Sequence, residues 1–577
     1  MVWQHPSREI CLLMPSHDVL IIGAGLAGQR AALEAARTGA SVAILSKVHP
    51  VRSHSVAAAG GINGAVKVTD SWESHAYDTV KGSDFLGDQD AIEVMCREAP
   101  GEILHLEHLG VTFHRNADGQ MDARAFGGAS AKRTFYVADI TGQAILHVLY
   151  EQLMKFSDQI DRYEEWFTTS LILNEDGSCG GCIARDIRTG RMEVFNAKST
   201  ILASGGAGQI FKPTTNALIC TADGMAQAYD VGAELMDMEM IQYHPTCMMN
   251  GFLITEGARG EGAHLINGEG ERFMGKYAPN KFELASRDVV SRAEQTEINE
   301  GRGAGPDKAG IYLDVTVVPT KRIHEALREI VNLGRDFAGV DITKEPILIR
   351  PGQHYIMGGV RTDVDGQVPK VPGLYAAGEV ACVSVHGGNR LGANSLLDTL
   401  IFGKRSGAHA AARAGDIAMP AAPTSRIEVD AKKLSKIISR ERTGRRVSEI
   451  KDELGVTMNR NCAVYRTQDE LEKQLEIVQR LKEEAKTAAI DDKGTVFNQD
   501  VLGAVELEYM TKVAETIVIG ALERKESRGA QARADFPDRN DEDFLKHFTI
   551  AADADGNPQL AEAPVTFTQW QPEVRSY

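Results

Sequence analysis

The sequence predicts an α/β fold in which a sheet domain is interrupted by an inserted capping domain and followed by a helical domain. An apolar run, a glycine turn and a helical stretch open the chain, and two later apolar runs also end in glycine turns. Charged helical patterning dominates after about residue 425. With 577 residues, 43% hydrophobic and 25% charged, the composition is that of a folded globular protein.

The first predicted element is a strand, a glycine turn and a helix. The apolar run 19–22 meets Gly23, Gly25 and Gly28, and a helical stretch covers 29–38. Glycine allows the tight turn and lets backbone amides approach a pyrophosphate at the helix N-terminus. A turn that only packs a helix onto a sheet is the alternative. The pattern favours dinucleotide binding by Gly23, Ala24, Gly25, Leu26, Ala27 and Gly28.

The second predicted strand, residues 42–45, limits which dinucleotide fits. NAD-binding proteins usually carry Asp or Glu at the end of this strand, where the carboxylate binds the ribose. This chain carries Ser46 and Lys47 there. We therefore expect NAD to fit poorly.

Two later segments predict further strands of the same sheet. Residues 200–206 and 373–379 each run from an apolar stretch into glycines, and both resemble the FAD motifs of flavoproteins with two dinucleotide folds. A helix-like stretch, 396–403, follows the second, where such proteins hold the ribityl chain and the isoalloxazine ring. Together with the first glycine turn, these segments predict FAD as the cofactor.

The order of these motifs predicts the domains. Since the three FAD segments belong in one domain, the residues before the last segment must include an insertion. We expect an FAD-binding domain at 16–245 and 350–425, an α+β capping domain at 246–349, a helical domain at 426–540 and a polar, less regular tail at 541–577.

Charge and cysteine content exclude several classes of protein. Asp and Glu outnumber Lys and Arg by 80 to 63, a net charge of -17, so most of the surface would repel a nucleic-acid backbone. No secretory signal opens the chain, and no apolar run is long enough for a membrane helix. Eight scattered cysteines predict free thiols and no metal site, with the Cys179–Cys182 pair in an ordinary turn.

Five polar clusters suggest the chemistry. The segment 52–55, followed by Gly60 and Gly61, lies where the chain of an FAD protein passes the flavin ring, and a His there can bond covalently to the flavin. The other four clusters lie at 242–262, 285–292, 354–359 and 386–395. Three of them set cations or donors among glycines, and 285–292 is typical of the start of a helix, with Arg287 near its N-terminal end.

These residue types suit a small dicarboxylate. Each carboxylate that enters a closed site needs charge-assisted donors worth roughly 1.5 to 3 kcal/mol each. His354 with Arg390 and His244 with Thr255 can each hold one carboxylate, so that the central carbons lie against the flavin. Hydride transfer at the flavin then requires a positioned acid or base for the neighbouring carbon.

All five clusters resemble, in order and with similar spacing, the flavoprotein subunits of succinate dehydrogenase and fumarate reductase, over about residues 17–548. The resemblance implies a catalytic subunit that interconverts succinate and fumarate. It also implies electron transfer to an iron-sulfur subunit and then to quinone, through membrane anchor subunits at the cytoplasmic face of the inner membrane. This chain itself has no cluster-type cysteine spacing.

The resemblance also assigns roles to residues. It implies that His54 carries the flavin covalently, and that Arg287 transfers the proton with Glu256 and Arg259 as its relay. An arginine has a pKa above about 12, so burial and a nearby second cation would be needed to make its proton mobile. The implied substrate residues are His244, Thr255, His354, Arg390 and Phe126. Further FAD residues implied are Ser46, Lys47, Ser53, Ser55, Gly60, Gly61, Asp223, Glu379, Ser395 and Leu396.

Three alternatives stay open from the sequence. Fumarate reduction uses the same residues as succinate oxidation, so the physiological direction is undetermined. L-aspartate oxidase is a soluble relative with much of the same site, but it typically lacks the flavin-bound His, and His54 argues against it. A flavin-containing tRNA-modifying protein is disfavoured by the acidic charge and the lack of a basic stripe.

Overall fold

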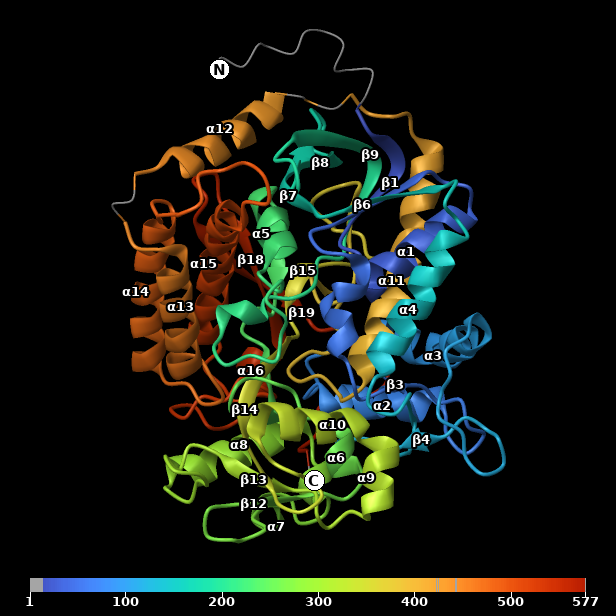
Figure 1. Ribbon diagram of the computed structural model, residues 1–577, viewed down its shortest axis with the longest axis vertical. Coiled ribbons are helices and arrows are strands. Elements are labelled where there is room, and N and C mark those ends of the chain that lie inside the picture. Colours follow the sequence, from blue (N-terminus) through green and yellow to red (C-terminus); the bar gives the residue numbers. More distant parts are fainter. Residues whose placement is uncertain (1–13, 422, 424, 442–443, 576–577) are drawn as a thin grey trace.

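The largest sheet of the molecule organises its upper half (Figure 1). The structure, a computed structural model, describes residues 14–421, 423, 425–441 and 444–575; Cys11 and positions 576–577 of the expected tail lie outside them. The sheet has seven strands in the order β6-β2-β1-β9-β8-β7, and β16 pairs with β9.

Parallel pairing gathers the predicted cofactor segments at one edge of this sheet. Neighbours β6 (Ile160–Glu164), β2 (Val42–Ser46), β1 (Ser16–Ile22) and β9 (Met192–Leu202) run parallel, and β16 (Leu374–Ala376) runs parallel to β9. Because parallel strands end at the same edge, the glycine turns that follow β1, β9 and β16 meet there.

The far side of the sheet corrects one prediction. β7 (Trp166–Leu173) and β8 (Cys179–Asp186) complete the sheet as antiparallel strands. The turn predicted for Cys179 and Cys182 is wrong, since both are buried on β8. Their small apolar side chains fill the core, and the seven described cysteines are all free and buried.

Two helices pack closely behind the parallel strands. α1 (Leu26–Arg37) lies against α11 (Asn394–Asp416), which extends well beyond the predicted stretch 396–403. A Cβ on Gly403 or Gly407 of α11 would come within 2.7 or 2.3 Å of a backbone oxygen of α1. Glycine at these positions therefore permits the close approach. The other helices of this layer are α2 (Trp72–Gly82), α3 (Gln89–Leu109) and α4 (Thr141–Met154).

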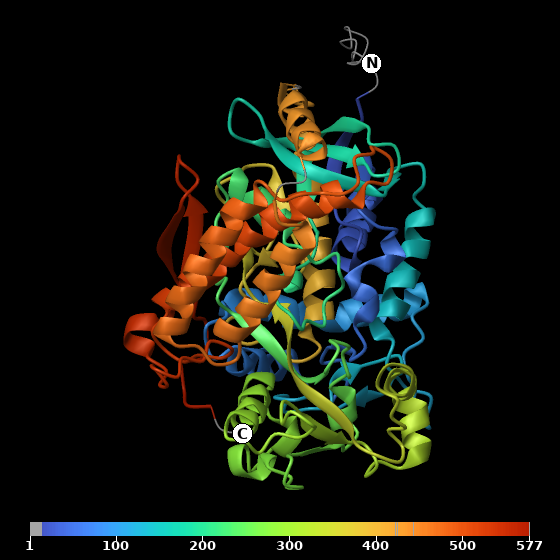
Figure 2. The same ribbon diagram turned by 60° about the vertical axis from the view of Figure 1, so that its left-hand side comes forward.

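The inserted region has its own small sheet and apolar core at the lower end of the molecule (Figures 1 and 2). An antiparallel sheet has the order β11 (Ile241–Met248), β14 (Ile347–Ile356), β13 (Ile311–Asp314), β12 (His264–Ile266). β11 and β14 cross the expected domain limits, so the chain enters and leaves the insertion through two paired strands. The helices here are α6 (Gly257–Gly260), α7 (Met274–Tyr277), α8 (Arg287–Asn299), α9 (Thr320–Ala326) and α10 (Arg328–Leu333).

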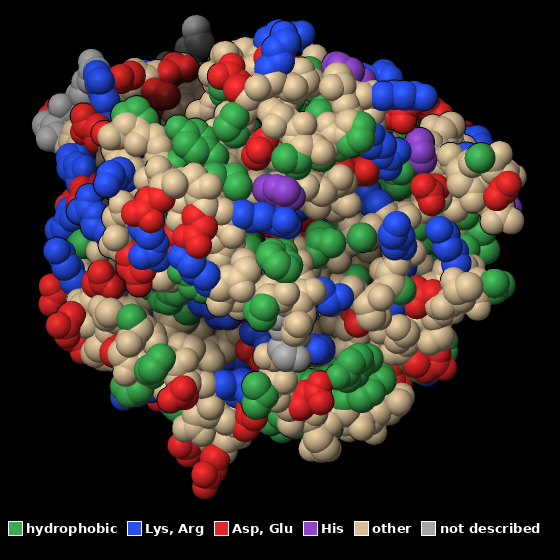
Figure 3. Space-filling view, turned by 90° about the horizontal axis from the view of Figure 1, so that it is seen from below, with side chains coloured by type: hydrophobic (Ala, Val, Ile, Leu, Met, Phe, Trp, Pro, Cys, Tyr) green, Lys and Arg blue, Asp and Glu red, His purple; other side chains and the backbone are tan. Residues whose placement is uncertain are grey.

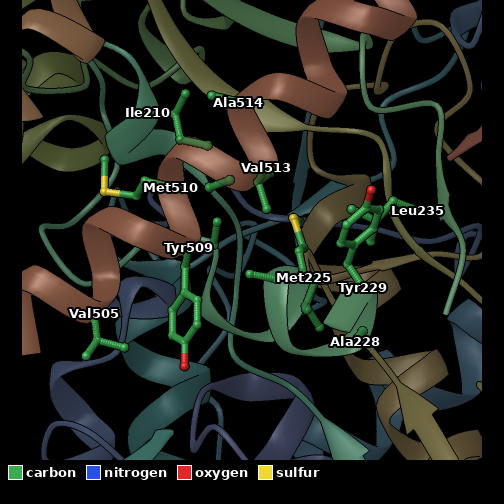
Figure 4. Packing of buried hydrophobic residues seen from close by; sticks show 14 of the residues in the cluster. Ile210, Met225, Ala228, Tyr229, Leu235, Val505, Tyr509, Met510, Val513 and Ala514 are labelled. Carbon is green, nitrogen blue, oxygen red and sulfur yellow. The ribbon is translucent and has the colours of Figure 1, made fainter. Parts of the chain in front are cut away.

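Helices dominate the region after α11. They are α12 (Ser425–Ser439), α13 (Val447–Asn461), α14 (Gln468–Ala485) and α15 (Gln499–Glu523). α15 is apolar on nearly all sides and packs on α5 (Asp223–Asp230) of the sheet domain, where Val513 lies beside Met225 (Figure 4). This packing brings the helical region up to the cofactor edge. Among the described residues, no helix is long and apolar enough to cross a membrane.

The segment expected to be irregular contains a hairpin. After α16 (Asp541–Phe544), β18 (Lys546–Ala552) and β19 (Pro558–Pro564) pair antiparallel. They extend a second sheet in the order β17-β15-β10-β18-β19, which includes β10 (Leu235–Met236), β15 (Gly359–Arg361) and β17 (Ala381–Cys382). The prediction of an irregular tail is thus wrong for these strands, because Phe548 and Ile550 bury their side chains against the molecule. A three-stranded sheet joins β3 (Ile62–Asn63), β5 (Thr134–Phe135) and β4 (Ala123–Arg124).

Candidate active site

A large cavity extends from the carboxyl-end edge of the main sheet to the inserted region. Of all the residues predicted for the site, only Gly28 and Arg259 do not line its wall. Gly28 lies beneath the turn, where an added Cβ would meet the Gly23 carbonyl oxygen at 1.9 Å. Its role is therefore to let α1 pack on β1, as the third glycine of this turn does in dinucleotide folds.

The wall along the sheet fits a dinucleotide. Gly23 has φ +112°, and an added Cβ would lie 2.1 Å from the Ala203 carbonyl oxygen, so glycine is required where β1 and β9 end together. The hydroxyls of Ser53 and Ser204 are buried there without a hydrogen-bond partner. Buried polar atoms normally have partners, and FAD phosphate and hydroxyl groups would supply them.

A partly buried ion cluster closes one end of this wall. Lys47 donates to Asp223 at 2.6 Å, Glu506 at 2.7 Å and Thr221 at 2.7 Å. Burial lowers the pKa of Lys47, but the two carboxylates outweigh it and raise the pKa. Lys47 therefore holds Asp223 in place. Glu506 comes from α15 and was not predicted, because nothing in its local sequence points to a residue so distant along the chain.

His54 lies on the cavity wall in its neutral form. It opens a short 3-10 helix, His54–Ala57, and the Ala217 backbone amide donates to its Nδ1 at 3.3 Å. Burial lowers the pKa of His54 to about 4. The imidazole is therefore uncharged near neutral pH, the form in which a histidine acts as a nucleophile.

Two histidines face each other across the paired strands of the inserted region. His244 on β11 and His354 on β14 have ring centroids 4.8 Å apart. Nδ1 of His354 is hydrogen-bonded to the Thr215 hydroxyl at 2.7 Å, and Nδ1 of His244 accepts from the Thr246 amide at 3.2 Å. Burial and the nearby arginines, chiefly Arg287, lower the pKa of both rings well below its usual value.

Two arginines share one neutral acceptor. Arg287 Nη1 and Arg390 Nη2 each donate to the side-chain oxygen of Gln242 at 3.0 Å. Arg390 also donates to Ser395 at 3.0 Å and lies 4.5 Å from the centre of the Tyr355 ring. Burial, followed by repulsion from Arg287, lowers the pKa of Arg390 to about 9. The pair thus carries positive charge that its protein neighbours do not fully compensate.

Gln242 is the main site residue that the sequence predictions missed. It is fully buried, and its amide also donates to Asn389 at 2.9 Å and to the Arg390 carbonyl at 2.8 Å. The available signal was its position two residues before His244 on a strand, where i and i+2 share a face.

A chain of charged groups leads from the cavity into the inserted region. Arg287 Nε donates to Glu256 Oε2 at 2.7 Å, and the Gly127 amide donates to Oε1 at 2.7 Å. Arg259, behind the wall, lies 3.8 Å from Oε1. Burial raises the pKa of Glu256, but Arg287 and Arg259 outweigh it and keep the carboxyl ionised. Burial lowers the pKa of Arg287 more than Glu256 raises it.

The remaining predicted residues fit around this core. Thr255 lines the cavity one residue before Glu256, and Phe126 packs so close to Gly60 that an added Cβ there would lie 2.7 Å from its ring. Glu379, beyond β16, is partly buried on the cavity wall, and desolvation raises its pKa to about 7. Gly61, Ser55 and Leu396 line the same wall.

Comparison with known proteins places this site in a family. A family model described as an FAD binding domain matches residues 18–396, and one described as a fumarate reductase flavoprotein C-terminal region matches residues 451–577. The succinate dehydrogenase flavoprotein subunit of Rickettsia conorii is 44% identical, with 96% of each chain covered. The fumarate reductase flavoprotein subunit of Mycobacterium tuberculosis is 42% identical, covering 97% of this chain and 99% of the relative.

Structural comparison agrees. A quinol fumarate reductase chain of E. coli superposes with a TM-score of 0.93 at 37% identity, covering 97% of this chain and 98% of that chain. The similarity spans both the cofactor edge and the helical region. This chain therefore belongs to the family of FAD-dependent succinate dehydrogenase and fumarate reductase flavoprotein subunits, and it is an enzyme of that class.

Proposed function

We propose that this flavoprotein interconverts succinate and fumarate in the cavity between the main sheet and the inserted region. The observation that carries the proposal is the pair Arg287 and Arg390, joined through neutral Gln242 and only partly balanced by Glu256. Two buried cations without matching anions are costly unless a ligand supplies negative charge. A small dicarboxylate supplies two negative charges.

The side chains around the pair set the orientation of the substrate. His354 and Arg390 hold one carboxylate, and His244 with Thr255 holds the other, while Phe126 lies against the carbon skeleton. Since Nδ1 of each histidine already has a protein partner, Nε2 is the ring nitrogen that meets the substrate. Each charge-assisted hydrogen bond contributes roughly 1.5 to 3 kcal/mol, so binding energy is available to orient the substrate.

Arg287 is the proposed acid and base. FAD, when bound, supplies hydride acceptance and donation at its N5 position. Arg287 moves the proton at the neighbouring carbon, because burial and a second cation lower its pKa and Glu256 is positioned to exchange a proton with its Nε. Arg259 continues the path on the far side of Glu256.

We also propose that His54 attaches the FAD covalently. Its neutral form and its partly buried place on the cavity wall support this role. The residues that hold the rest of the cofactor are the glycine turn after β1, with Ser46 and Asp223 at one end and Glu379, Ser395 and Leu396 at the other.

Electrons are proposed to leave through an iron-sulfur subunit and reach quinone in a membrane anchor, which places this chain at the cytoplasmic face of the membrane. Its relatives are named as flavoprotein subunits, and the E. coli structure is named a quinol fumarate reductase. No nucleic-acid partner is proposed. The face seen in Figure 3 carries acidic and basic side chains intermixed, and the chain has a net charge of -17.

The test combines flavin detection with turnover. The denatured wild-type protein is expected to show a fluorescent flavin band in a gel, and His54→Ala is expected to lose it, because only a covalent bond keeps FAD on an unfolded chain. The folded protein should oxidise succinate with a dye acceptor and reduce fumarate with a dye donor. A dark wild-type band together with peroxide formation from L-aspartate would instead identify an aspartate oxidase.

A further inference from the structure

The segment after β19 crosses the sheet domain and ends beside α8, the helix that carries Arg287. We call residues 565–575 the strap. Figure 2 shows the end of the described chain lying next to the helices of the inserted region. The function described above uses no residue of the strap.

The strap is held by one buried side chain of α3. The carbonyl oxygen of the Gln89 side chain accepts the backbone amides of residues 568, 569 and 570 at 3.0, 2.9 and 3.0 Å. The Gln89 amide donates to the Trp570 carbonyl at 2.6 Å, and the Thr566 amide donates to Asp88 at 2.6 Å. Gln89 has no exposed surface. The strap therefore has a fixed path and is not a loosely attached end.

After its contacts with Gln89, the strap places the guanidinium of Arg575 between two carboxylates. Arg575 Nη2 lies 2.8 Å from Asp84 and 2.7 Å from Asp288. Asp84 follows α2 in the sheet domain, whereas Asp288 is in the first turn of α8 in the inserted region. The Asp84, Asp288 and Arg575 side chains are 6%, 1% and 9% exposed.

Each carboxylate has a second cation, since Arg539 lies 2.9 Å from Asp84 and Arg292 lies 3.1 Å from Asp288, and Arg575 contacts both carboxylates. Burial raises the pKa of Asp288, but Arg575 and then Arg292 outweigh it and hold the pKa far below its usual range. At Asp84 burial and Asp288 both raise the pKa, and Arg575 and Arg528 lower it. Like charges held in a buried site repel strongly unless a counterion lies between them.

Asp288 is next to the proposed proton-transfer residue. The first turn of α8 carries Arg287, whose guanidinium contacts Glu256 and Gln242 on other elements. A shift at Asp288 therefore moves Arg287 relative to the substrate. Misplacement of about 1 Å at a reacting group can cost on the order of 100-fold in rate.

We propose that Arg575 is a positioning residue that ties the inserted region to the sheet domain through Asp84 and Asp288, and so holds Arg287 in its working place. The strap then keeps the inserted region in contact with the sheet domain. This inference rests on the proposed role of Arg287. Whether Arg575 stabilises the position of α8 can be tested without measuring turnover.

The experiment compares Arg575→Gln with Arg575→Lys in the flavin-loaded protein. Arg361→Gln serves as the matched control, since Arg361 pairs with Glu234 at 2.9 Å, is also partly buried and lies outside the site. Hydrogen exchange is measured on the amides of α8, with α15 as the internal reference. In parallel, kcat and KM for succinate are measured with a dye acceptor.

Arg575→Gln is expected to speed exchange in α8 about tenfold while α15 stays protected. It should lower kcat about tenfold or more with a smaller change in KM and unchanged covalent flavin. Arg575→Lys should recover part of both effects, and Arg361→Gln should change neither. Unchanged exchange in α8, or equal loss of protection in α8 and α15, would overturn the proposal.

If Arg575→Gln does not fold, a second variant tests the same proposal. Asp84→Asn removes one of the opposing charges, and Asn tolerates the positive φ of +54° at this position. The double variant Asp84→Asn/Arg575→Gln should therefore fold, although α8, which has lost its tie to the sheet domain, should still exchange faster than in the wild type. If it also fails to fold, charge repulsion is not what Arg575 opposes, and the proposal is wrong. A wild-type protein that turns over neither succinate nor fumarate overturns the proposed function but leaves the exchange result valid.

Discussion

Two buried pairs of arginines show how the same residue type serves two purposes. The cavity pair, Arg287 and Arg390, shares a neutral glutamine and has Glu256 as its nearest carboxylate. The second pair, Arg524 and Arg528, lies just before the tail and contacts it at Phe544 and Asp541, so we call it the tail pair. It is enclosed by acidic side chains, with Glu239 2.7 Å from Arg524 and Glu526 2.7 Å from Arg528. Both pairs are buried, but only the tail pair is balanced by its own protein.

The pKa shifts follow this difference in charge balance. At Arg390 burial lowers the pKa and repulsion from Arg287 adds to this effect, so the value falls to about 9. At Arg524 Glu239 outweighs burial, and the pKa rises. A balanced cluster holds a fold together, whereas an unbalanced one keeps positive charge available for a ligand.

The largest expected effect is the loss of proton transfer in Arg287→Ala. Removing a positioned acid or base costs about 100- to 10,000-fold in rate, and we expect kcat to fall about 1,000-fold. Flavin should remain attached, because His54 does not depend on Arg287. Turnover with dye acceptors and in-gel flavin fluorescence measure the two properties. Near-normal turnover with intact flavin would remove Arg287 from the mechanism.

Arg524→Gln should instead affect stability. The substitution leaves Glu239 buried without its cation, whereas Glu526 keeps Arg528, and a buried charge without its partner typically costs about 3 to 5 kcal/mol of unfolding free energy. Denaturant unfolding measures this loss, and KM for succinate in the folded fraction should stay at the wild-type value. A changed KM with wild-type stability would contradict the division between the two pairs.

Arg390→Ala should produce a smaller effect, chiefly on binding. Losing one charge-assisted contact of roughly 1.5 to 3 kcal/mol raises KM for the dicarboxylate about 10- to 100-fold. Arg390→Lys keeps the charge but not the two-pronged geometry, so it should fall between wild type and Arg390→Ala. Steady-state kinetics with succinate and fumarate give the comparison, and equal KM values in all three proteins would exclude Arg390 from substrate binding.

The cofactor edge was the part of the fold most open to prediction. Each glycine turn follows an apolar run directly, so local sequence identifies both the strand and the loop, and parallel pairing then brings the loops together. Glycine-rich neighbours also mark most of the charged segments that line the cavity, whereas the roles proposed for Arg287, Glu256 and Arg259 rest on the family resemblance. Gln242 was missed because its neutral amide becomes important only when two arginines from distant segments meet at it.

The tail was the least predictable region. β18 buries the consecutive residues 547–550 and so lacks the alternation typical of a strand with one exposed face. The strand that fixes its position, β10, has only two residues and lies about 300 positions earlier. Glu506 and Arg575 likewise act through partners that are far away in sequence. Contacts of this kind depend on how whole elements pack, and no local pattern encodes them.

Histidines extend the comparison, and they give the smallest predicted effect. In the cavity the pKa values of His244 and His354 are lowered. Near the tail pair, Asp237, 2.7 Å away, and Asp88 outweigh the effect of burial on His547 and raise its pKa to about 10.

A histidine with a raised pKa stabilises the fold fully below its unfolded value near 6.5, and this contribution disappears as the pH rises through about 10. The melting temperature of the wild-type protein should therefore fall between pH 6.5 and 10. His547→Gln should melt lower at pH 6.5 and show a flatter slope across that window. An identical slope in both proteins would mean that His547 is not held as a cation, and that the balance of charge around the tail does not extend to it.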